Sequence, residues 1–98
     1  MTQQAMLEEL EAAAARLAVK VSYESLATSV GTGGLCRVRG EYRVIIDKRT
    51  QVGDRVSALA QALAYLPTLT IEGPEPTMKF SPAVRHLIRH YAAMRRAS

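Results

Sequence analysis

Two histidines near the C-terminus have the spacing of a metal-binding helix. His86 and His90 stand four residues apart in the stretch HLIRH, so on a helix both imidazoles could reach one metal ion. In catalytic helices of the H-E-x-x-H type a glutamate follows the first histidine and serves as general base, but Leu87 stands there. The chain has no third histidine, so a further ligand would have to be Cys36 or a carboxylate. We therefore expect two surface histidines, with no metal and no other cofactor.

The other groups that could do chemistry lack the partners that catalysis requires. The histidines have no serine or cysteine in a nucleophile frame, and no pair of carboxylates has a setting that would separate their acidities. Asp47 follows an apolar run, where a functional carboxylate is common, but it could equally start the next turn. Gly31, Gly33 and Gly34 lack the spacing of a dinucleotide-binding fingerprint, so a loop that leads into a strand is favoured over phosphate binding. The sequence predicts a protein that is not an enzyme.

Positive charge is the functional signal that remains. The net charge is +4 with an isoelectric point near 9.6, and basic residues concentrate in 37–55 and 85–96. Such charge favours anionic partners, although basic residues at the end of a helix also suit the negative end of its dipole. The candidate contacts to nucleic acid or another anionic partner are Arg37, Arg39, Arg43, Arg85, Arg89 and Arg96. A solvated surface is the alternative, because the turn before the last helix is too long and proline-rich for a helix-turn-helix frame and few exposed aromatic residues are expected for base stacking.

Three helices are predicted from apolar residues that recur at steps of three and four. The first covers residues 2–18, with Thr2 as its N-cap. The second covers about residues 52–66 and is ended by a proline. The third opens at Ser81-Pro82, an N-cap followed by a first-turn proline, and continues to about residue 96.

Strands are predicted where apolar and polar residues alternate. Residues 19–24 have this pattern and follow the first helix directly. Residues 35–39 and 42–47 are expected to form a hairpin that is joined tightly at Gly40-Glu41. One face of this hairpin is predicted to be apolar, and the other to carry its three arginines.

These elements suggest one small domain of mixed architecture. A chain of 98 residues fits a single domain that covers residues 1–98, and 48% hydrophobic with 22% charged residues is typical of a folded protein. We predict an α+β fold with an N-terminal helix and a small, mainly antiparallel sheet of three to four strands, the fourth being a short edge strand at 68–72. Two further helices are expected to pack on one face of the sheet.

The composition also predicts where the protein resides. The apolar-looking run at residues 12–19 is far shorter than the roughly 20 residues that cross a bilayer. The N-terminus MTQQAMLEEL lacks the basic start and apolar middle of a signal peptide. The single cysteine, Cys36, excludes an intramolecular disulfide, fits a reducing compartment and is expected to be a buried strand residue. We predict a cytoplasmic protein without a membrane partner.

The stretch LAQALAYL, residues 59–66, has the apolar frame of a zinc-peptidase helix. Together with the preceding RVIIDKRT and the order of the predicted elements, it resembles the N-terminal part of ImmA/IrrE-type zinc metallopeptidases. On that resemblance the first histidine of HExxH falls on Gln61, the glutamate on Ala62 and the second histidine on Tyr65. Because these residues cannot bind zinc tightly or activate water, the resemblance implies a scaffold that has lost its chemistry. The surface around Gln61 and Tyr65 is the candidate interaction site.

The chain also resembles small uncharacterised bacterial proteins that carry a GGLCRxRG hairpin, here residues 33–40, and a late PAVRxLI helix. That resemblance implies no activity. We predict a non-enzymatic, cytoplasmic interaction or regulatory module that binds a protein partner, of which a second copy of the chain is one candidate. The alternative is a nucleic-acid-binding module that uses the six arginines.

Overall fold

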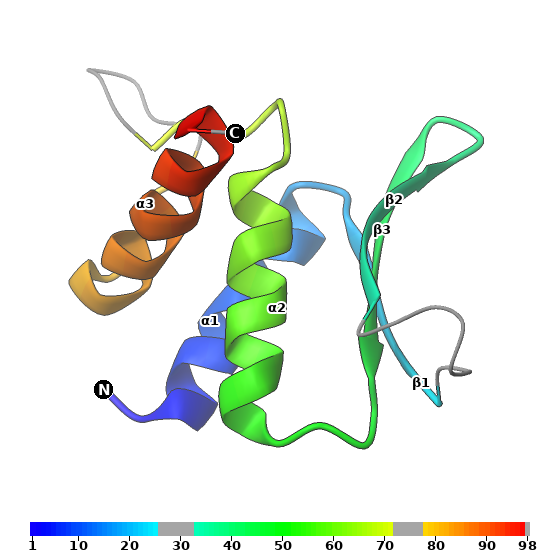
Figure 1. Cartoon of the computed structure of the whole chain (residues 1–98), viewed down its shortest axis with the longest axis horizontal. Helices are drawn as coiled ribbons and strands as arrows, with labels where there is room; N and C mark the ends of the chain where they lie inside the picture. The colour runs from blue at the N-terminus through cyan, green and yellow to red at the C-terminus, as the bar shows by residue number, and fades with distance from the viewer. Residues whose placement is uncertain (26–32, 72–77, 98) are drawn as a thin grey trace.

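A computed structural model describes residues 1–25, 33–71 and 78–97 of the chain. The elements in chain order are α1 (Gln3–Arg16), β1 (Lys20–Glu24), β2 (Gly33–Val38), β3 (Glu41–Asp47), α2 (Val52–Ala64) and α3 (Pro82–Ala97), as Figure 1 shows. The predicted α+β class and the three predicted helices are confirmed. Most of the predicted glycine-rich loop (26–32) and the proline-rich turn (72–77) lie outside the described residues.

The sheet has three strands in the order β1-β3-β2. β2 and β3 form the predicted antiparallel hairpin, but β1 pairs with β3 in parallel, with Val21 opposite Val44. The sheet is therefore mixed rather than mainly antiparallel. β1 lies on the side of β3 away from β2 and runs in the same direction as β3. The edge strand expected at 68–72 is not a strand at residues 68–71, and Glu72 lies outside the described part.

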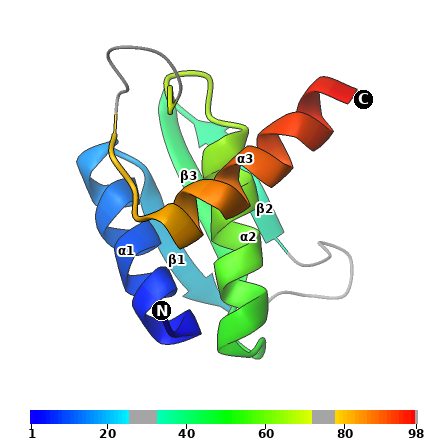
Figure 2. The ribbon, with the colours of Figure 1, turned by 90° about the vertical axis from the view of Figure 1, so that its left-hand side faces the viewer.

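The helices form two layers on one side of the sheet (Figures 1 and 2). α1 packs against β1, while α2 packs against β2 and β3 and also contacts α1. α3 lies across α2 and α1 on the side away from the sheet, as Figure 2 shows. Of the two later helices, only α2 therefore covers the sheet directly. Within the described ranges, no helix is long and apolar enough to cross a membrane.

The core is built around α2, because this helix is enclosed by the other elements. Six of its residues are buried, compared with four of α1. The largest fully buried side chains are Leu10, Ile46, Leu59, Leu63, Leu66, Ile88, Val44 and Val84. They come from α1, β3, α2, the segment just after α2 (Leu66) and α3, so one continuous core joins the sheet to both helical layers.

Local hydrogen bonds define both ends of α1, and the N-terminal end was predicted from the sequence. Thr2 is the predicted N-cap, and its hydroxyl accepts a 3.1 Å hydrogen bond from the Ala5 N–H. At the other end Ala18 has a left-handed backbone with φ of 60°, and the Val19 N–H donates to the Ala14 carbonyl at 2.8 Å. This is the Schellman arrangement, which usually takes glycine. It turns the chain sharply from α1 into β1.

The turn of the hairpin differs by one residue from the prediction. β2 ends at Val38 and β3 begins at Glu41, so the two-residue loop is Arg39-Gly40 rather than Gly40-Glu41. Both loop residues have positive φ, 52° at Arg39 and 80° at Gly40. A type I′ turn requires this geometry, and its twist matches that of the flanking strands.

Candidate functional site

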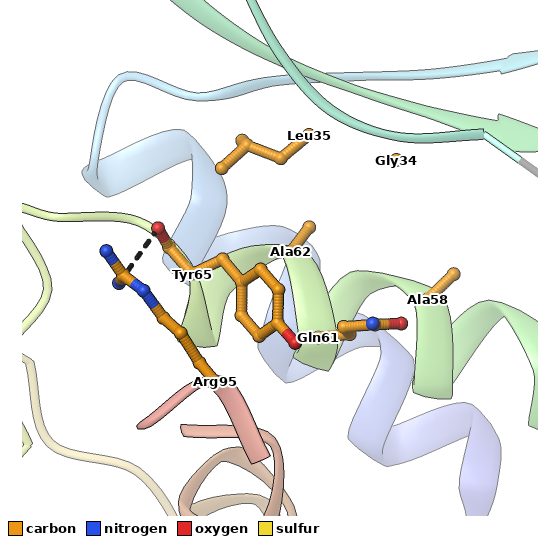
Figure 3. A pocket seen from close by; sticks show the side chains of 7 residues that line it. All are labelled: Gly34, Leu35, Ala58, Gln61, Ala62, Tyr65 and Arg95. Carbon is orange, nitrogen blue, oxygen red and sulfur yellow. Dashed lines mark hydrogen bonds between the residues drawn. The ribbon is translucent and has the colours of Figure 1, made fainter. Parts of the chain in front are cut away.

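A pocket of about 390 Å³ lies between the edge strand β2 and helix α2. It is lined by Gly34, Leu35, Ala58, Gln61, Ala62, Tyr65 and Arg95. Figure 3 shows Leu35 on the strand facing the α2 side chains across the cavity. The two residues singled out from the sequence, Gln61 and Tyr65, thus lie side by side in this pocket, and Ala62 lines it between them.

A second pocket continues the first along α2. It measures about 360 Å³, is lined by Ile46, Thr50, Asp54, Ser57, Ala58 and Gln61, and so shares Ala58 and Gln61 with the first. We name the two together the α2–β2 groove. From Asp54 to Tyr65 the helix advances about 16 Å at a rise of about 1.5 Å per residue. That length matches roughly five residues of extended chain at about 3.3 Å each.

Helix α3 contributes a side chain to one end of the groove. Arg95 of α3 donates an N–H to the Tyr65 carbonyl at 3.2 Å, and its guanidinium lies 5.8 Å from the centroid of the Tyr65 ring (Figure 3). Sequence reasoning missed Arg95, because the two residues are 30 positions apart and only the packing of α3 on α2 brings them together. The groove therefore has a fixed positive charge at its Tyr65 end.

The strand that borders the groove is the edge of the sheet. In the described part of the chain β2 pairs only with β3, so its other side has no strand beside it. A type I′ turn closes on its flanking residues, so Val38 and Glu41 should be a hydrogen-bonded pair and every second pair along the ladder should be too. By this alternation Leu35 and Arg37 direct their backbone N–H and C=O groups away from β3. Among the described residues no other strand pairs with these groups, so an added strand could bond to them.

Asp47 has a structural role in the connection from β3 to α2. The residue is 8% exposed, and its carboxylate accepts hydrogen bonds from the Arg49 backbone N–H at 3.0 Å and from the Arg49 guanidinium. These bonds hold the pKa of Asp47 below its ordinary value. Thr50 adds two further bonds to the Asp47 carbonyl. Of the two roles that the sequence left open, starting the turn is the one supported.

Arg55 fixes the same connection from the side of α2. Its guanidinium donates to the Thr50 carbonyl at 3.1 Å and to the Lys48 carbonyl at 2.6 Å. It also lies 5.0 Å from the centroid of the Tyr23 ring, and the Tyr23 hydroxyl donates to Glu11. One side chain therefore ties α2 to the loop before it and to β1, which sets the position of α2 beside the sheet.

Because of the Tyr23 hydroxyl, we expect the free energy of unfolding to decrease at high pH. Burial, followed by the hydrogen bond to Glu11, raises the pKa of Tyr23 far above its ordinary value of 10.0. The folded protein therefore keeps a proton that the unfolded chain releases, so the stabilisation is complete below pH 10 and decreases as the pH rises further. Urea unfolding followed between pH 8 and 11 should show a shallower decrease for Tyr23→Phe than for the unchanged protein. Parallel decreases would contradict this role.

The hairpin arginines do not share one face, so that prediction is wrong. Directly opposed residues of a sheet point to the same side, and Arg37 is opposite Tyr42, over whose ring its guanidinium lies at 5.4 Å. Arg43 is opposite Cys36, on the other face, and forms a 3.3 Å ion pair with Glu41. Arg39 occupies the turn.

The arginines of the last helix lie on a further surface. Arg85 and Arg89 are exposed on α3, which is separated from the sheet by the α1–α2 layer (Figure 2). Arg96 belongs to α3, but its side chain lies outside the described part. The structure therefore does not gather the six candidate arginines into one patch.

The histidines and the cysteine also have defined positions. His86 and His90 are exposed on α3, and the His90 ring meets the edge of the Tyr91 ring at 5.2 Å. Across the described residues, no three His, Cys, Asp or Glu side chains are close enough to hold one metal ion. Cys36 is a strand residue as predicted, but it is half-buried on the sheet face away from the helices rather than buried.

Comparison of the chain with family models, with curated proteins and with solved structures finds no match.

Proposed function

We propose that this protein is a non-enzymatic, cytoplasmic protein-interaction module whose binding site is the α2–β2 groove. The partner contributes an extended segment that lies beside β2 and sends alternate side chains into the groove. The observation that carries the proposal is the position of a pocket of about 390 Å³, with Gln61 and Tyr65 in its wall, directly next to a strand edge.

The shape and chemistry of the groove favour an extended protein segment. Strand addition at an edge combines main-chain hydrogen bonds with pockets for alternate side chains, and both parts of this recognition mode adjoin here. The walls offer apolar surface from Leu35, Ala58 and Ala62, with polar groups from Gln61 and Tyr65. At the three positions that would carry HExxH chemistry, a glutamine, an alanine and a tyrosine suit binding and provide no base for a metal-bound water.

A protein partner is favoured over nucleic acid because of where the arginines lie. A nucleic-acid module would need the six candidate arginines on one surface, whereas Arg37 and Arg43 lie on opposite faces of the sheet. Arg85 and Arg89 lie on α3, beyond the helical layer. No single positive surface from these residues therefore supports the alternative.

Site-specific cross-linking tests the proposal. A photoreactive phenylalanine derivative at Gln61, which is exposed at the groove, should capture a protein from a lysate of the source organism. The same group at His86, which is exposed on the outer side of α3, should not. Capture of a second copy of the chain would identify the partner as the protein itself.

A second test compares a variant in which a phenylalanine fills the groove with a control variant in which a phenylalanine is placed elsewhere. Ala58 lines both pockets, so Ala58→Phe should fill their junction and reduce capture from position 61 by about tenfold or more, because the shared volume is lost. Ala83→Phe adds the same group to the exposed side of α3 and should leave capture unchanged. Equal capture from positions 61 and 86, or capture that survives Ala58→Phe in a folded protein, would refute the proposal.

A further inference from the structure

The two ends of the α2–β2 groove carry opposite charges. Asp54 lines the pocket at the start of α2, together with the hydroxyl groups of Thr50 and Ser57. Arg95 lines the pocket at the end of α2, where it is held against Tyr65. A carboxylate with two neighbouring hydroxyl groups suits a cation, and a guanidinium suits a carboxylate.

The middle of the groove combines small apolar side chains of α2 with the polar Gln61, which lines both pockets. Ala58 and Ala62 line it from α2, and Leu35 of β2 lies opposite Ala62 (Figure 3). The small side chains leave room for one branched apolar side chain of a ligand. The groove therefore offers three successive sites: anion-accepting at Arg95, mainly apolar in the middle and cation-accepting at Asp54.

The direction of β2 along these sites follows from the pairing. Gly33 is opposite Ile46, which lines the Asp54 end, whereas Leu35 lines the pocket that contains Arg95. β2 thus runs from the Asp54 end towards the Arg95 end. A strand that adds antiparallel to β2 runs the opposite way and meets Arg95 first, and antiparallel pairing is slightly more stable per residue than parallel pairing.

We propose that the α2–β2 groove selects its ligand by the order of the charged residues along the peptide. The preferred peptide is extended and has an acidic residue, a branched apolar residue two positions later and a basic residue two positions after that. The spacing follows because alternate side chains of a strand share a face and the groove spans roughly five extended residues. This inference rests on the proposed function, since it names the ligand of the same groove.

Two peptides of identical composition test the inference. The forward peptide is acetyl-Gly-Glu-Thr-Val-Thr-Lys-Gly-amide, and in the reversed peptide the glutamate and lysine exchange places. Each is titrated at low ionic strength into the ¹⁵N-labelled full chain, and amide shifts give the Kd. We expect the forward peptide to bind about tenfold more tightly, because two attractive charge contacts become two repulsive ones on reversal. The amides of Leu35 and Arg37 should shift most on β2, since their N–H groups face the added strand.

A matched pair of charge-reversal variants tests whether Asp54 causes the preference for one charge order. Asp54→Lys should weaken the forward peptide and abolish the preference for order, whereas Glu8→Lys makes the same charge change on an exposed position of α1 and should preserve the preference. Arg37→Pro removes the guanidinium and the outward N–H, whereas Arg37→Ala removes only the guanidinium, so the proline variant should bind both peptides more weakly than the alanine variant.

The possible failures are distinguishable. Equal affinities for both orders, or tighter binding of the reversed peptide, would overturn the charge-order inference while leaving the groove as a binding site. Absence of binding by either peptide, while the Gln61 cross-linker still captures a partner, would also overturn this inference alone. Loss of cross-linking as well would refute the proposed function.

Discussion

Replacing Leu63 with alanine is expected to lower the free energy of unfolding by about 2–5 kcal/mol, the largest effect of any single change considered for this chain. Leu63 is 0% exposed and lies on α2, the helix that contacts α1, α3, β2 and β3. Removing its branched end takes apolar contact from the centre of the core and leaves a cavity that the enclosing elements can close only in part. The loss is a large fraction of the roughly 5–15 kcal/mol by which domains are stable.

Urea unfolding followed by circular dichroism measures this loss. Leu87→Ala is the matched control, because Leu87 is a leucine of α3 that is only half-buried. The control should lose less stability, since less apolar surface is removed from the interior. Equal losses in the two variants would show that the core is not centred on α2.

Replacing Arg55 with alanine is expected to lower the free energy of unfolding by about 2–3 kcal/mol. The guanidinium donates to two backbone carbonyls in the loop between β3 and α2, and hydrogen bonds from charged donors contribute about 1.5–3 kcal/mol each. We take a value below the sum because the bond to Lys48 is exposed to solvent. The variant also loses the contact with the Tyr23 ring.

Two controls separate the geometry of Arg55 from its charge. Arg55→Lys keeps the charge but cannot donate in a planar fork to both carbonyls, so it should recover only part of the loss. Arg43→Ala removes an exposed ion pair with Glu41 and should cost at most about 1 kcal/mol. Full recovery by lysine would mean that charge alone matters. Because the loop positions α2 beside the sheet, Arg55→Ala should also weaken peptide binding in the groove.

The helices could be predicted from sequence because their signals are local. Thr2 caps α1 as predicted, and apolar residues at helical spacing mark α2 and α3 close to their observed bounds. The hairpin was also predictable, since alternation and a glycine-containing turn occur within fifteen residues of one another. Even the wall of the groove was partly predicted, because the positions of Gln61 and Tyr65 on the α2 helix fall outside its apolar stripe.

The arginine faces could not be predicted from residue type alone. Alternation combined with polarity predicts all three arginines on one face of the hairpin, but the pairing puts Arg37 on the same face as Tyr42 and buried Val44. This face is apolar where the helices cover it and becomes exposed towards the turn, where a guanidinium can lie over an aromatic ring and still reach water. Near the tip of the hairpin, the polarity of a side chain therefore does not indicate on which face of the sheet the residue lies.

The sequence by itself determined most of the elements, the class of fold and the absence of an HExxH motif, because each depends on residues that are near one another in the chain. Only the tertiary structure decided that β1 joins β3 in parallel, that α3 lies on helices rather than on the sheet, and that Arg95 and Asp54 mark opposite ends of one groove. These depend on which apolar faces bury each other across long separations, and many pairings satisfy the same local pattern. The groove exists only once that packing is complete.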